Sequence, residues 1–496
     1  MLTQLQNGSD IRGVAIETEE KKINLDLDSC RKIAVGFYLW LRGKTGKNSG
    51  MKIALGMDSR LSGSDIKKAV TDSLINLGCT VLDCGLSTTP SMYMTTVFDA
   101  YSCDGAIMVT ASHLPYYYNG LKFFTESGGC ESNDIKSILE LAECNVDVPS
   151  NVGAVVEMPL LNDYSQHLVK IIRDGIASKS DYERPLCGMK IIVDAGNGAG
   201  GFFAEKVLEV LGADTSGSQF LEPDGTFPNH VPNPEDKQAM ESVTRATVIS
   251  GSDLGIIFDT DVDRAAIVTG DGEEINRNAL IALLSAIVLE ENPGATIVTD
   301  SVTSTGLTEF IQNLGGVHHR FKRGYRNVIR ECIRLNENGI NSPMAIETSG
   351  HGAMRENYYL DDGSYLIAKL LIKAAKLRRD GKELVSLISN LKEAREASAY
   401  RLGINTKGFR IYGETVLNNL NDFVNTVKGW SVEPVNYEGV RVNCDKNAGD
   451  GWFLMRLSLH EPLMVINIES DSDGGVNIIK SHLEEFLSVY VLVDKM

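Results

Sequence analysis

Three short apolar stretches of similar sequence decide the fold: MKIALGMD (residues 51–58), MKIIVD (residues 189–194) and ATIVTD (residues 295–300). Each stretch predicts a buried β-strand, because an apolar run of this length bounded by polar residues is typical of a strand inside a sheet. Each is followed by small and hydroxyl residues and then by a helical stretch that ends at a Leu-Gly pair, as helices closed by glycine do. The chain therefore contains an internal repeat of strand followed by helix.

A second apolar segment also repeats, as GAIMVT (residues 105–110), LGIIFD (residues 254–259) and PMAIE (residues 343–347). Strands that alternate with helices predict βαβ units with mainly parallel sheets and helices on both faces. The three segments run directly into TASH, DTDVD and ETSGH. Ligands bind beyond the carboxyl ends of such strands, so we expect these three loops to converge on one cleft.

The last hundred residues do not repeat this pattern and predict a smaller α+β domain. We therefore expect an α/β protein of three similar βαβ-type domains with mixed, mainly parallel sheets, followed by that smaller C-terminal domain. The predicted domains are residues 1–150, 151–272, 273–391 and 392–496. A chain of 496 residues is long enough for each domain to bury its own core.

The charge balance argues against partners that are themselves polyanions. The chain has 48 Lys and Arg against 66 Asp and Glu, a formal net charge of −18. Most of such a surface repels nucleic acid and anionic membranes, so an anionic substrate requires a local basic pocket. No apolar run approaches the roughly 18 residues that cross a bilayer, and no secretory signal pattern opens the chain.

The nine cysteines include no CxxC pair and predict reduced thiols in a reducing compartment. We therefore expect a cytoplasmic protein, present as a monomer or homodimer. An alternative is an organelle such as a plastid, if a targeting segment preceded the chain and was removed.

Asp259, Asp261 and Asp263 alternate directly after the apolar run that ends at residue 258. Three carboxylates at this spacing repel one another unless a cation balances them, and hard oxygen ligands suit Mg²⁺. The same spacing opens an EF-hand, but Arg264 stands where that loop needs glycine. The alternative to a magnesium site is a solvated acidic turn.

Ser112 and His113 lie in the loop TASHLP (residues 110–115). A serine hydroxyl is a weak nucleophile unless a base or cation activates it, and His113, Lys122 and the predicted Mg²⁺ are candidates. The alternative is a helix-capping serine. The GxSxG motif of lipases is absent from the loop, so acyl transfer has no support there.

The loops TASHLP with YNGLK (residues 118–122), DTDVDR (residues 259–264) and ETSGH (residues 347–351) together resemble the α-D-phosphohexomutase superfamily, and its phosphoglucomutase/phosphomannomutase group in particular. Further matching segments are SDIRG (9–13), GMDSR (56–60), PDGTFPN (223–229), NPE (233–235) and RGYR (323–326). The resemblance implies four domains around a central cleft and the interconversion of hexose 1-phosphate and hexose 6-phosphate, of glucose, mannose or both. A phosphoserine at Ser112 would pass its phosphoryl group to the sugar phosphate and recover one from the other end.

The resemblance also implies a role for each matching residue. Ser112 would complete the Mg²⁺ shell of the three aspartates, and a hexose 1,6-bisphosphate would act as activator. By the same resemblance, Arg12 and Lys122 would lie near the phosphoserine, and His351 would take part in acid/base chemistry. Arg264 and Arg326 would contact oxygens of the substrate or of the phosphoserine. Glu347 and Ser349 would bind the sugar hydroxyls.

One loop departs from the family pattern. The family closes its cleft with RPSGTEP, whereas this chain reads RLSLHEP at residues 456–462. Arg456 and Ser458 are retained as the expected phosphate ligands, but Leu459 replaces glycine and His460 replaces threonine. Leucine lacks the conformational freedom of glycine, so we expect the loop to bend differently.

Other functions compete with this interpretation. GNGAGG (residues 196–201) follows a predicted strand and satisfies the dinucleotide-binding pattern, but it leaves the aspartates and Ser112 unexplained. A phosphoglucosamine mutase and a catalytically weak, mutase-like sugar-phosphate-binding protein remain alternatives.

Overall fold

The computed structural model describes residues 2–144, 152–179, 181–458 and 461–496. The chain forms two compact units: Met1–Leu280 with Ser349–Ser386, and Ile281–Thr348 with Leu387–Met496. The predicted domain boundary at residues 150 and 151 lies outside the described residues.

The first sheet of unit 1 has the strand order β1-β2-β6-β5-β3-β4-β8, and β7 pairs with β6. Strands β3, β4, β5 and β8 pair in parallel, whereas β1, β2, β6 and β7 pair antiparallel. The bounds are β1 Gln6–Asn7, β2 Asp10–Val14, β3 Lys52–Met57, β4 Thr80–Leu86, β5 Gly105–Val109, β6 Tyr118–Thr125, β7 Gly128–Gly129 and β8 Ala154–Glu157.

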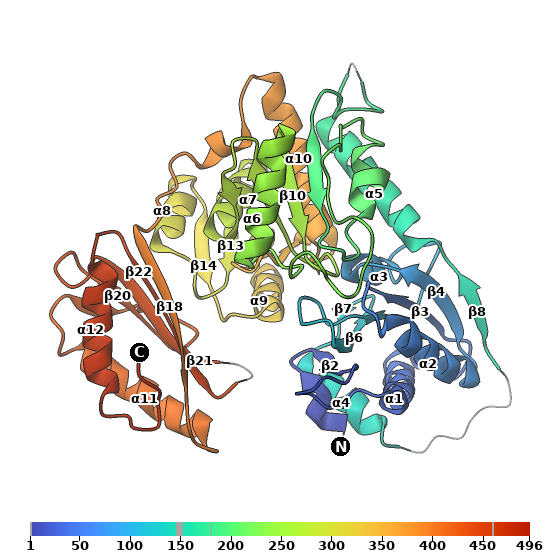
Figure 1. Ribbon diagram of the computed structural model, residues 1–496, viewed down its shortest axis with the longest axis horizontal. Coiled ribbons are helices and arrows are strands. Elements are labelled where there is room, and N and C mark those ends of the chain that lie inside the picture. The colour runs from blue at the N-terminus through green and yellow to red at the C-terminus, as the bar shows by residue number, and fades with distance from the viewer. Residues whose placement is uncertain (1, 145–151, 180, 459–460) are drawn as a thin grey trace. The chain divides into compact units, whose positions relative to one another are not determined.

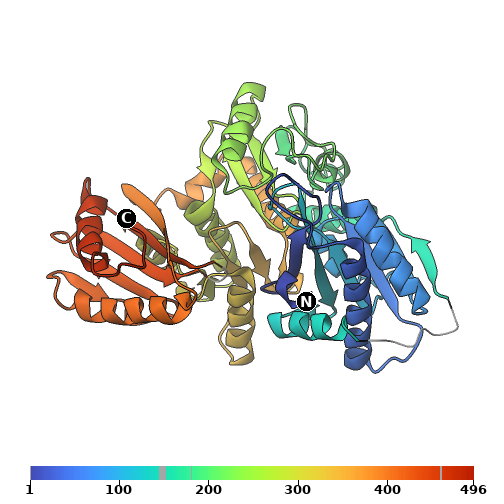
Figure 2. The ribbon, with the colours of Figure 1, turned by 60° about the horizontal axis from the view of Figure 1, so that its bottom comes forward.

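Helices cover both faces of this sheet. Helices α1 (Leu27–Thr45), α2 (Gly63–Asn76) and α4 (Ser132–Leu141) share one apolar core with the strands, and Figures 1 and 2 show them in blue and cyan on the same side. Helix α3 (Thr89–Met94) contacts β3, β5 and β6 from the other face, and a 3₁₀ turn, Leu2–Leu5, opens the chain.

The second sheet of unit 1 has the order β12-β11-β10-β9. Strands β9 and β10 are parallel and the other pairs are antiparallel. Helix α6 packs on β9, β10 and β11, and α10 packs on α5 and β11. The bounds are α5 Leu160–Ile176, β9 Ile191–Asp194, α6 Lys237–Ser250, β10 Leu254–Phe258, β11 Ala265–Thr269, β12 Glu274–Ile275 and α10 Gly363–Arg379.

The remaining α/β elements divide between the units. In unit 2, β13 pairs in parallel with β14 and β15, and α9 packs on β13 and β15. In unit 1, β16 and β17 form an antiparallel pair. The bounds are α7 Arg277–Glu291, β13 Thr296–Thr299, α8 Thr305–Asn313, β14 Val317–Arg320, α9 Tyr325–Glu337, β15 Met344–Ile346, β16 Gly352–Met354, β17 Leu360–Asp361, and the 3₁₀ turns Arg355–Asn357 and Leu384–Ile388.

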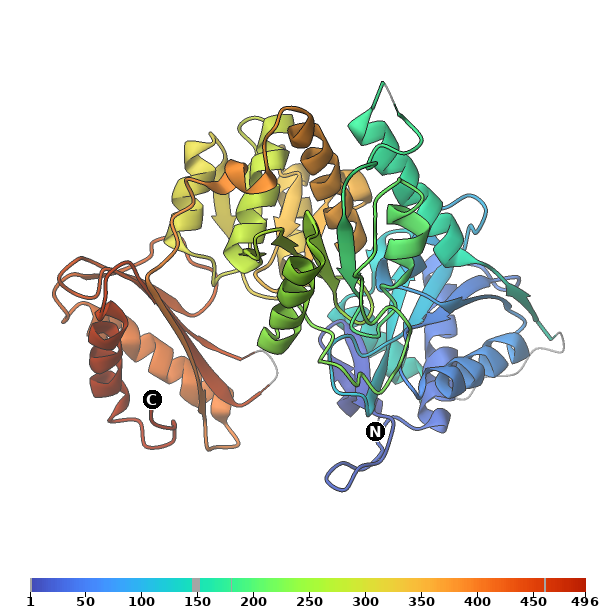
Figure 3. The ribbon, with the colours of Figure 1, turned by 45° about the horizontal axis from the view of Figure 1, so that its top comes forward.

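The end of the chain, also in unit 2, forms an antiparallel sheet of order β18-β22-β21-β20-β19. Helices α11 and α12 share one apolar core with this sheet and lie on the same side of it (Figure 3). The bounds are β18 Glu396–Gly403, α11 Phe409–Val424, β19 Trp430–Val432, β20 Val440–Cys444, β21 Gly451–Leu457, β22 Leu463–Ser470 and α12 Gly475–Leu487.

The repeat predicted from the sequence is present as paired strands. Each first segment forms the strand β3, β9 or β13, and each lies parallel and next to the strand of the second segment, β5, β10 or β15. The expected architecture, three α/β domains with mixed sheets and a smaller α+β domain, is confirmed.

The Leu-Gly pairs also end their repeats as expected, with one difference in the preceding helix. Gly78, Gly212 and Gly315 adopt positive φ angles of 78°, 92° and 80°. The segment before Gly212 contains a π-helical turn, Ala204–Leu208, in which the Glu209 amide donates to the Ala204 carbonyl five residues earlier. Among the described residues, no helix is both long and apolar enough to cross a bilayer.

Candidate functional site

The Ser112 loop joins β5 to β6 in unit 1. Ser112 is 1% exposed and has a φ of +53°, a left-handed conformation that costs a non-glycine residue free energy. Its backbone amide donates to Thr110 Oγ1 at 2.9 Å. The hydroxyl of Ser112 donates to Asp259 Oδ2 at 3.2 Å, so the loop after β5 delivers the serine to the aspartate loop after β10.

Arg60 holds this loop in shape. Its guanidinium donates to the carbonyls of Leu114, Pro115 and Tyr118 at 2.6, 2.9 and 2.9 Å, and also to that of Ser112. Since the side chain is buried, these bonds are formed in a region from which water is excluded. Sequence reasoning quoted Arg60 within the GMDSR segment but gave it no role, because carbonyl contacts leave no sequence pattern.

Three buried carboxylates gather beyond the carboxyl end of β10. Asp259, Asp261 and Asp263 each offer an oxygen within 4.8 Å of the others. Val262, between two of them, has a φ of +66°, which is rare for a β-branched residue. Asp261 Oδ1 is buried and accepts no hydrogen bond from the described residues.

Neighbouring groups neutralise part of this negative charge. Lys122 Nζ lies 3.0 Å from Asp261 Oδ2 and 2.6 Å from Asp263 Oδ2, and Thr89 Oγ1 donates to Asp261 Oδ2 at 2.5 Å. Burial and the other two carboxylates raise the pKa of Asp259 well above its usual value. Burial opposes ionisation of Asp263 as well, but Lys122, His351 and Arg264 outweigh it and hold that pKa well below its usual value.

These residues fit a hard divalent cation. The cluster supplies carboxylate oxygens, the ligand type that such cations prefer, and two of these oxygens, Asp261 Oδ1 and Asp263 Oδ1, accept no hydrogen bond from the described residues. Burial first, and then the charges of Asp263 and Asp261, raise the pKa of Asp259, so a cation bound beside it would favour its ionised form.

Arg264 connects the serine loop to both histidines. Its Nη2 donates to His113 Nδ1 at 2.5 Å and lies 3.5 Å from Ser112 Oγ, and its Nε donates to His351 Nε2 at 3.2 Å. Burial and the charges of Arg264 and Arg12 lower the pKa of His113 to about 2, so its imidazole is neutral. Burial, with Arg264, also lowers the pKa of His351.

His351 is oriented by residues on both of its ring nitrogens. Because Arg264 donates to Nε2, Nδ1 carries the ring proton toward Ser349 Oγ, 2.8 Å away. Asp263 Oδ1 and Asp361 Oδ2 lie 3.5 and 3.8 Å from Nε2. Sequence reasoning missed Asp361, although the DDGS segment before α10 placed two acidic residues at a helix N-terminus.

Arg12 lies on β2, beside β6, which carries Lys122. Its guanidinium pairs with Asp10 at 2.9 Å, and its positive charge acts on His113. Unit 1 therefore brings together every predicted site residue that it contains: Arg12, Ser112, His113, Lys122, Asp259, Asp261, Asp263, Arg264, Ser349 and His351.

Unit 2 holds the other predicted residues. Glu347, 4% exposed at the end of β15, accepts from the Gly324 amide at 2.6 Å. Arg326, in the first turn of α9, lies over the Tyr325 ring with 5.1 Å from guanidinium carbon to ring centroid.

The phosphate residues expected in the last domain lie at the end of β21. Arg456 is 6% exposed, and its Nη1 lies 3.8 Å from Glu438 Oε1. The backbone amide of Ser458 donates to the Leu463 carbonyl at 2.9 Å. Leu459 and His460, the two departures from the family loop, lie outside the described residues.

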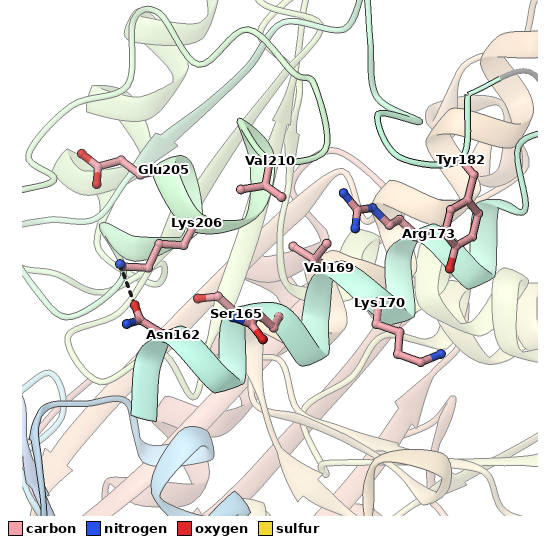
Figure 4. Close-up of a pocket in the computed structure, with 10 residues that line it drawn as sticks. Asn162, Ser165, Val169, Lys170, Arg173, Tyr182, Glu205, Lys206 and Val210 are labelled. Atoms are coloured by element: carbon pink, nitrogen blue, oxygen red, sulfur yellow. Dashed lines mark hydrogen bonds between the residues drawn. The ribbon is translucent and has the colours of Figure 1, made fainter. Parts of the chain in front are cut away.

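A cavity of about 720 Å³ in unit 1 contains none of these residues (Figure 4). It lies between α5 and the π-helical turn. Its cations have partners of their own: Lys206 donates to Asn162 Oδ1 at 2.7 Å, Arg173 pairs with Glu183, and Lys170 pairs with Asp174. The cavity therefore carries no functional assignment.

Comparisons with known proteins identify the family. Models of the phosphoglucomutase/phosphomannomutase α/β/α domains I, II and III match residues 3–145, 162–272 and 276–393. Phosphomannomutase/phosphoglucomutase of Pseudomonas aeruginosa is 31% identical over 86% of each chain, and phosphomannomutase of Escherichia coli is 30% identical over 88% of this chain and 91% of its own.

Solved structures agree. A phosphoglucomutase/phosphomannomutase family protein of Burkholderia thailandensis superimposes with a TM-score of 0.79 at 27% identity, covering 97% of this chain and 96% of its own. A second solved structure, from Thermus thermophilus, has the same fold. It superimposes with a TM-score of 0.71 at 18% identity, covering 98% of this chain and 100% of that chain. The chain therefore belongs to the phosphoglucomutase/phosphomannomutase family of the α-D-phosphohexomutase superfamily.

Proposed function

We propose that this protein is a hexose-phosphate mutase whose phosphoryl carrier is Ser112. The observation that carries the proposal is the contact between the Ser112 hydroxyl and Asp259 in a buried cluster of three carboxylates, with Arg264 beside the same oxygen. Phosphoryl transfer needs positioning and neutralisation of oxygen charge more than covalent chemistry, and this cluster provides both.

The reaction balances without a net change in the enzyme. The phosphoryl group leaves Ser112 Oγ for a free hydroxyl of a hexose monophosphate; a base takes the proton of that hydroxyl, and one proton is delivered to the departing Ser112 Oγ. The bisphosphate then returns its other phosphoryl group to Ser112 Oγ, whose proton passes to a base, and one proton is delivered to the sugar oxygen that is released. His351 is the candidate base, because burial and Arg264 keep its imidazole neutral, and its Nε2 can accept a proton once the Arg264 hydrogen bond is released.

We assign the metal to Asp259, Asp261 and Asp263, with an oxygen of the phosphorylated Ser112 completing the shell. Mg²⁺ is the cation that such hard ligands and a phosphate suit, and when bound it would neutralise charge on the phosphoryl oxygens. A hexose 1,6-bisphosphate would serve as activator, since it restores the phosphate on a serine that has lost it.

The residues proposed to contact the substrate form two groups, one for the sugar hydroxyls and one for the phosphate. Glu347 and Ser349 offer oxygens for the sugar hydroxyls, whereas Arg326, Arg456 and Ser458 offer donors for the phosphate that is not being transferred. Relatives bear phosphoglucomutase and phosphomannomutase names, which favours glucose and mannose phosphates over glucosamine phosphate. The alternative of a catalytically weak binding protein is not favoured.

The domain boundaries, the cellular location and the oligomeric state are also proposals. We place domain boundaries near residues 150, 272 and 391, and we place the protein in the cytoplasm as a monomer or homodimer. No disulfide bond joins cysteines of the described residues, which supports a reducing compartment.

The test is a coupled assay of glucose 1-phosphate, mannose 1-phosphate and glucosamine 1-phosphate, with glucose 1,6-bisphosphate present. We expect turnover of the first two, loss of turnover with a chelator and recovery with Mg²⁺. Asp261→Asn should weaken Mg²⁺ binding and rate together, whereas the exposed Asp271→Asn should resemble the wild type. Full turnover in a metal-free preparation would contradict the metal assignment.

A further inference from the structure

Glu438 lies between β19 and β20 of the last domain, outside every motif that sequence reasoning used. Its side chain is 12% exposed, and its carboxylate meets three segments of unit 2. Ser301 Oγ donates to Oε2 at 2.5 Å, the Arg323 amide donates to the same oxygen at 3.1 Å, and Arg456 Nη1 lies 3.8 Å from Oε1.

The turn that carries Glu438 is shaped to lie against Arg456. Gly439 has a φ of +58°, and a Cβ there would lie 2.2 Å from the Met455 carbonyl oxygen and 2.8 Å from Arg456 Cβ. Only glycine fits this approach. Asn436 Nδ2 donates to the carbonyls of both Glu438 and Gly439 at 2.9 Å and fixes the turn.

Two consecutive backbone amides link Glu438 to Glu347, the residue proposed to bind sugar hydroxyls. The Arg323 amide donates to Glu438, and the next amide, of Gly324, donates to Glu347. One short backbone segment thus joins the carboxylate expected to bind sugar hydroxyls to the carboxylate beside the expected phosphate ligand.

The charge of Glu438 also matches that of Arg456. Burial lowers the pKa of the Arg456 guanidinium, and Glu438 is the largest opposing influence on it. The pairing keeps a buried cation charged while its distance, 3.8 Å, leaves guanidinium donors available for a phosphate.

We propose that Glu438 is a positioning residue that holds Arg456 and the Arg323–Gly324 backbone in one arrangement, so that the phosphate and the sugar hydroxyls of one hexose phosphate are bound together. This inference rests on the proposed function. Glu438 does not touch the substrate and acts through Arg456 and through the backbone that meets Glu347.

The experiment measures the Kd of glucose 6-phosphate by calorimetry, with kcat and KM measured alongside. We expect E438A to raise Kd and KM about tenfold with a smaller effect on kcat, because ground-state and transition-state binding are lost together. E438Q should raise Kd only about threefold, since its carbonyl still accepts from Arg323 but its charge is gone.

Glu433→Gln is the matched control. Glu433 lies on the same hairpin and accepts from Asn443 Nδ2 at 3.0 Å, so its replacement removes one negative charge from the hairpin without touching the Arg456 site. We expect its Kd to stay within about twofold of the wild type, since its hydrogen-bond donor is Asn443 and not a residue of the Arg456 site.

A double-mutant cycle tests whether Glu438 acts through Arg456. In an R456A background, E438A should raise Kd by less than about threefold further, since coupled residues are not additive. The inference would be overturned if the fold-changes in Kd caused by E438A and R456A multiplied fully in the double variant. It would also be overturned if the E438A protein bound glucose 6-phosphate like the wild type. Wild-type protein that binds glucose 6-phosphate without turnover would refute the proposed function instead.

Discussion

Arg60 shows how one buried side chain shapes the serine loop. Four backbone carbonyls of residues 112–118 accept from its guanidinium, and Asp58 lies 3.3 Å from its Nε. A guanidinium can serve several acceptors in fixed directions, which an ammonium cannot. The left-handed conformation of Ser112 is therefore maintained by its surroundings rather than by local preference.

Arg60→Lys should lower kcat by at least about tenfold, because a lysine cannot reach all four carbonyls and the serine loop would relax. The coupled assay measures this effect, and phosphorylation of Ser112 by the bisphosphate should slow in parallel. Arg31→Lys, an exposed change on α1, is the control. A kcat for Arg60→Lys within twofold of the control would show that the loop holds its shape without Arg60.

At this scale the sequence predicted which residues gather but not what positions them. Ser112 and the three aspartates meet as expected, since each loop follows the second strand of its repeat, β5 in the first sheet and β10 in the second. Arg60 and Glu438 were not predicted because their partners are distant in the chain. Asp361 was not predicted because a lone acidic residue usually indicates only a solvated surface.

At the scale of elements, β10 positions the loop of the three aspartates by packing tightly on α6. Gly255 permits this contact, because a Cβ there would lie 2.0 Å from Thr247 Oγ1, whose hydroxyl donates to the Val243 carbonyl. The sequence predicted β10 from its apolar run, but the requirement for glycine depends on how closely the helix approaches.

Gly255→Ala should therefore destabilise unit 1 by about 1–3 kcal/mol, the usual result of overpacking a core. A urea unfolding curve of this variant with a lower midpoint than that of the wild type would show the loss of stability. Gly255→Ala combined with Thr247→Ala should recover part of the loss, because the second change removes the clashing hydroxyl. If the single variant unfolds at the wild-type midpoint, the packing of α6 on β10 is looser than described.

At the scale of the whole molecule, the expected functions divide between the two units. The serine, the aspartates and both histidines belong to unit 1, whereas Glu347 and Arg456 belong to unit 2. The repeat and the smaller α+β domain at the C-terminus were predicted from the apolar pattern, but the antiparallel pairing of the last sheet was not. The division into two units was not predicted, because the boundary lies between Thr348 and Ser349, within one predicted motif.

Burial of the thiols gives a test of the fold as a whole. Cys144 and Cys187 are exposed, and the other seven cysteines are buried. Burial raises the pKa to about 12 at five of them: Cys30, Cys79, Cys84, Cys103 and Cys444.

Because only the thiolate reacts, a thiol reagent should label two cysteines of the native protein from about pH 7 to about pH 9, and all nine in denaturant. Mass spectrometry of labelled peptides identifies them. Rapid labelling of Cys30 or Cys444 in the native protein would contradict the packing of the first or the last domain.

The phosphoryl group on Ser112 is the central claim, and its transfer can be measured directly. Wild-type protein incubated with glucose 1,6-bisphosphate labelled in its phosphates should gain one phosphate, which peptide mapping locates at Ser112. A chase with unlabelled glucose 1-phosphate should move that label into sugar bisphosphate, and Ser112→Ala should take up none and show no turnover. Label on another residue, or a Ser112→Ala protein with wild-type activity, would contradict the account.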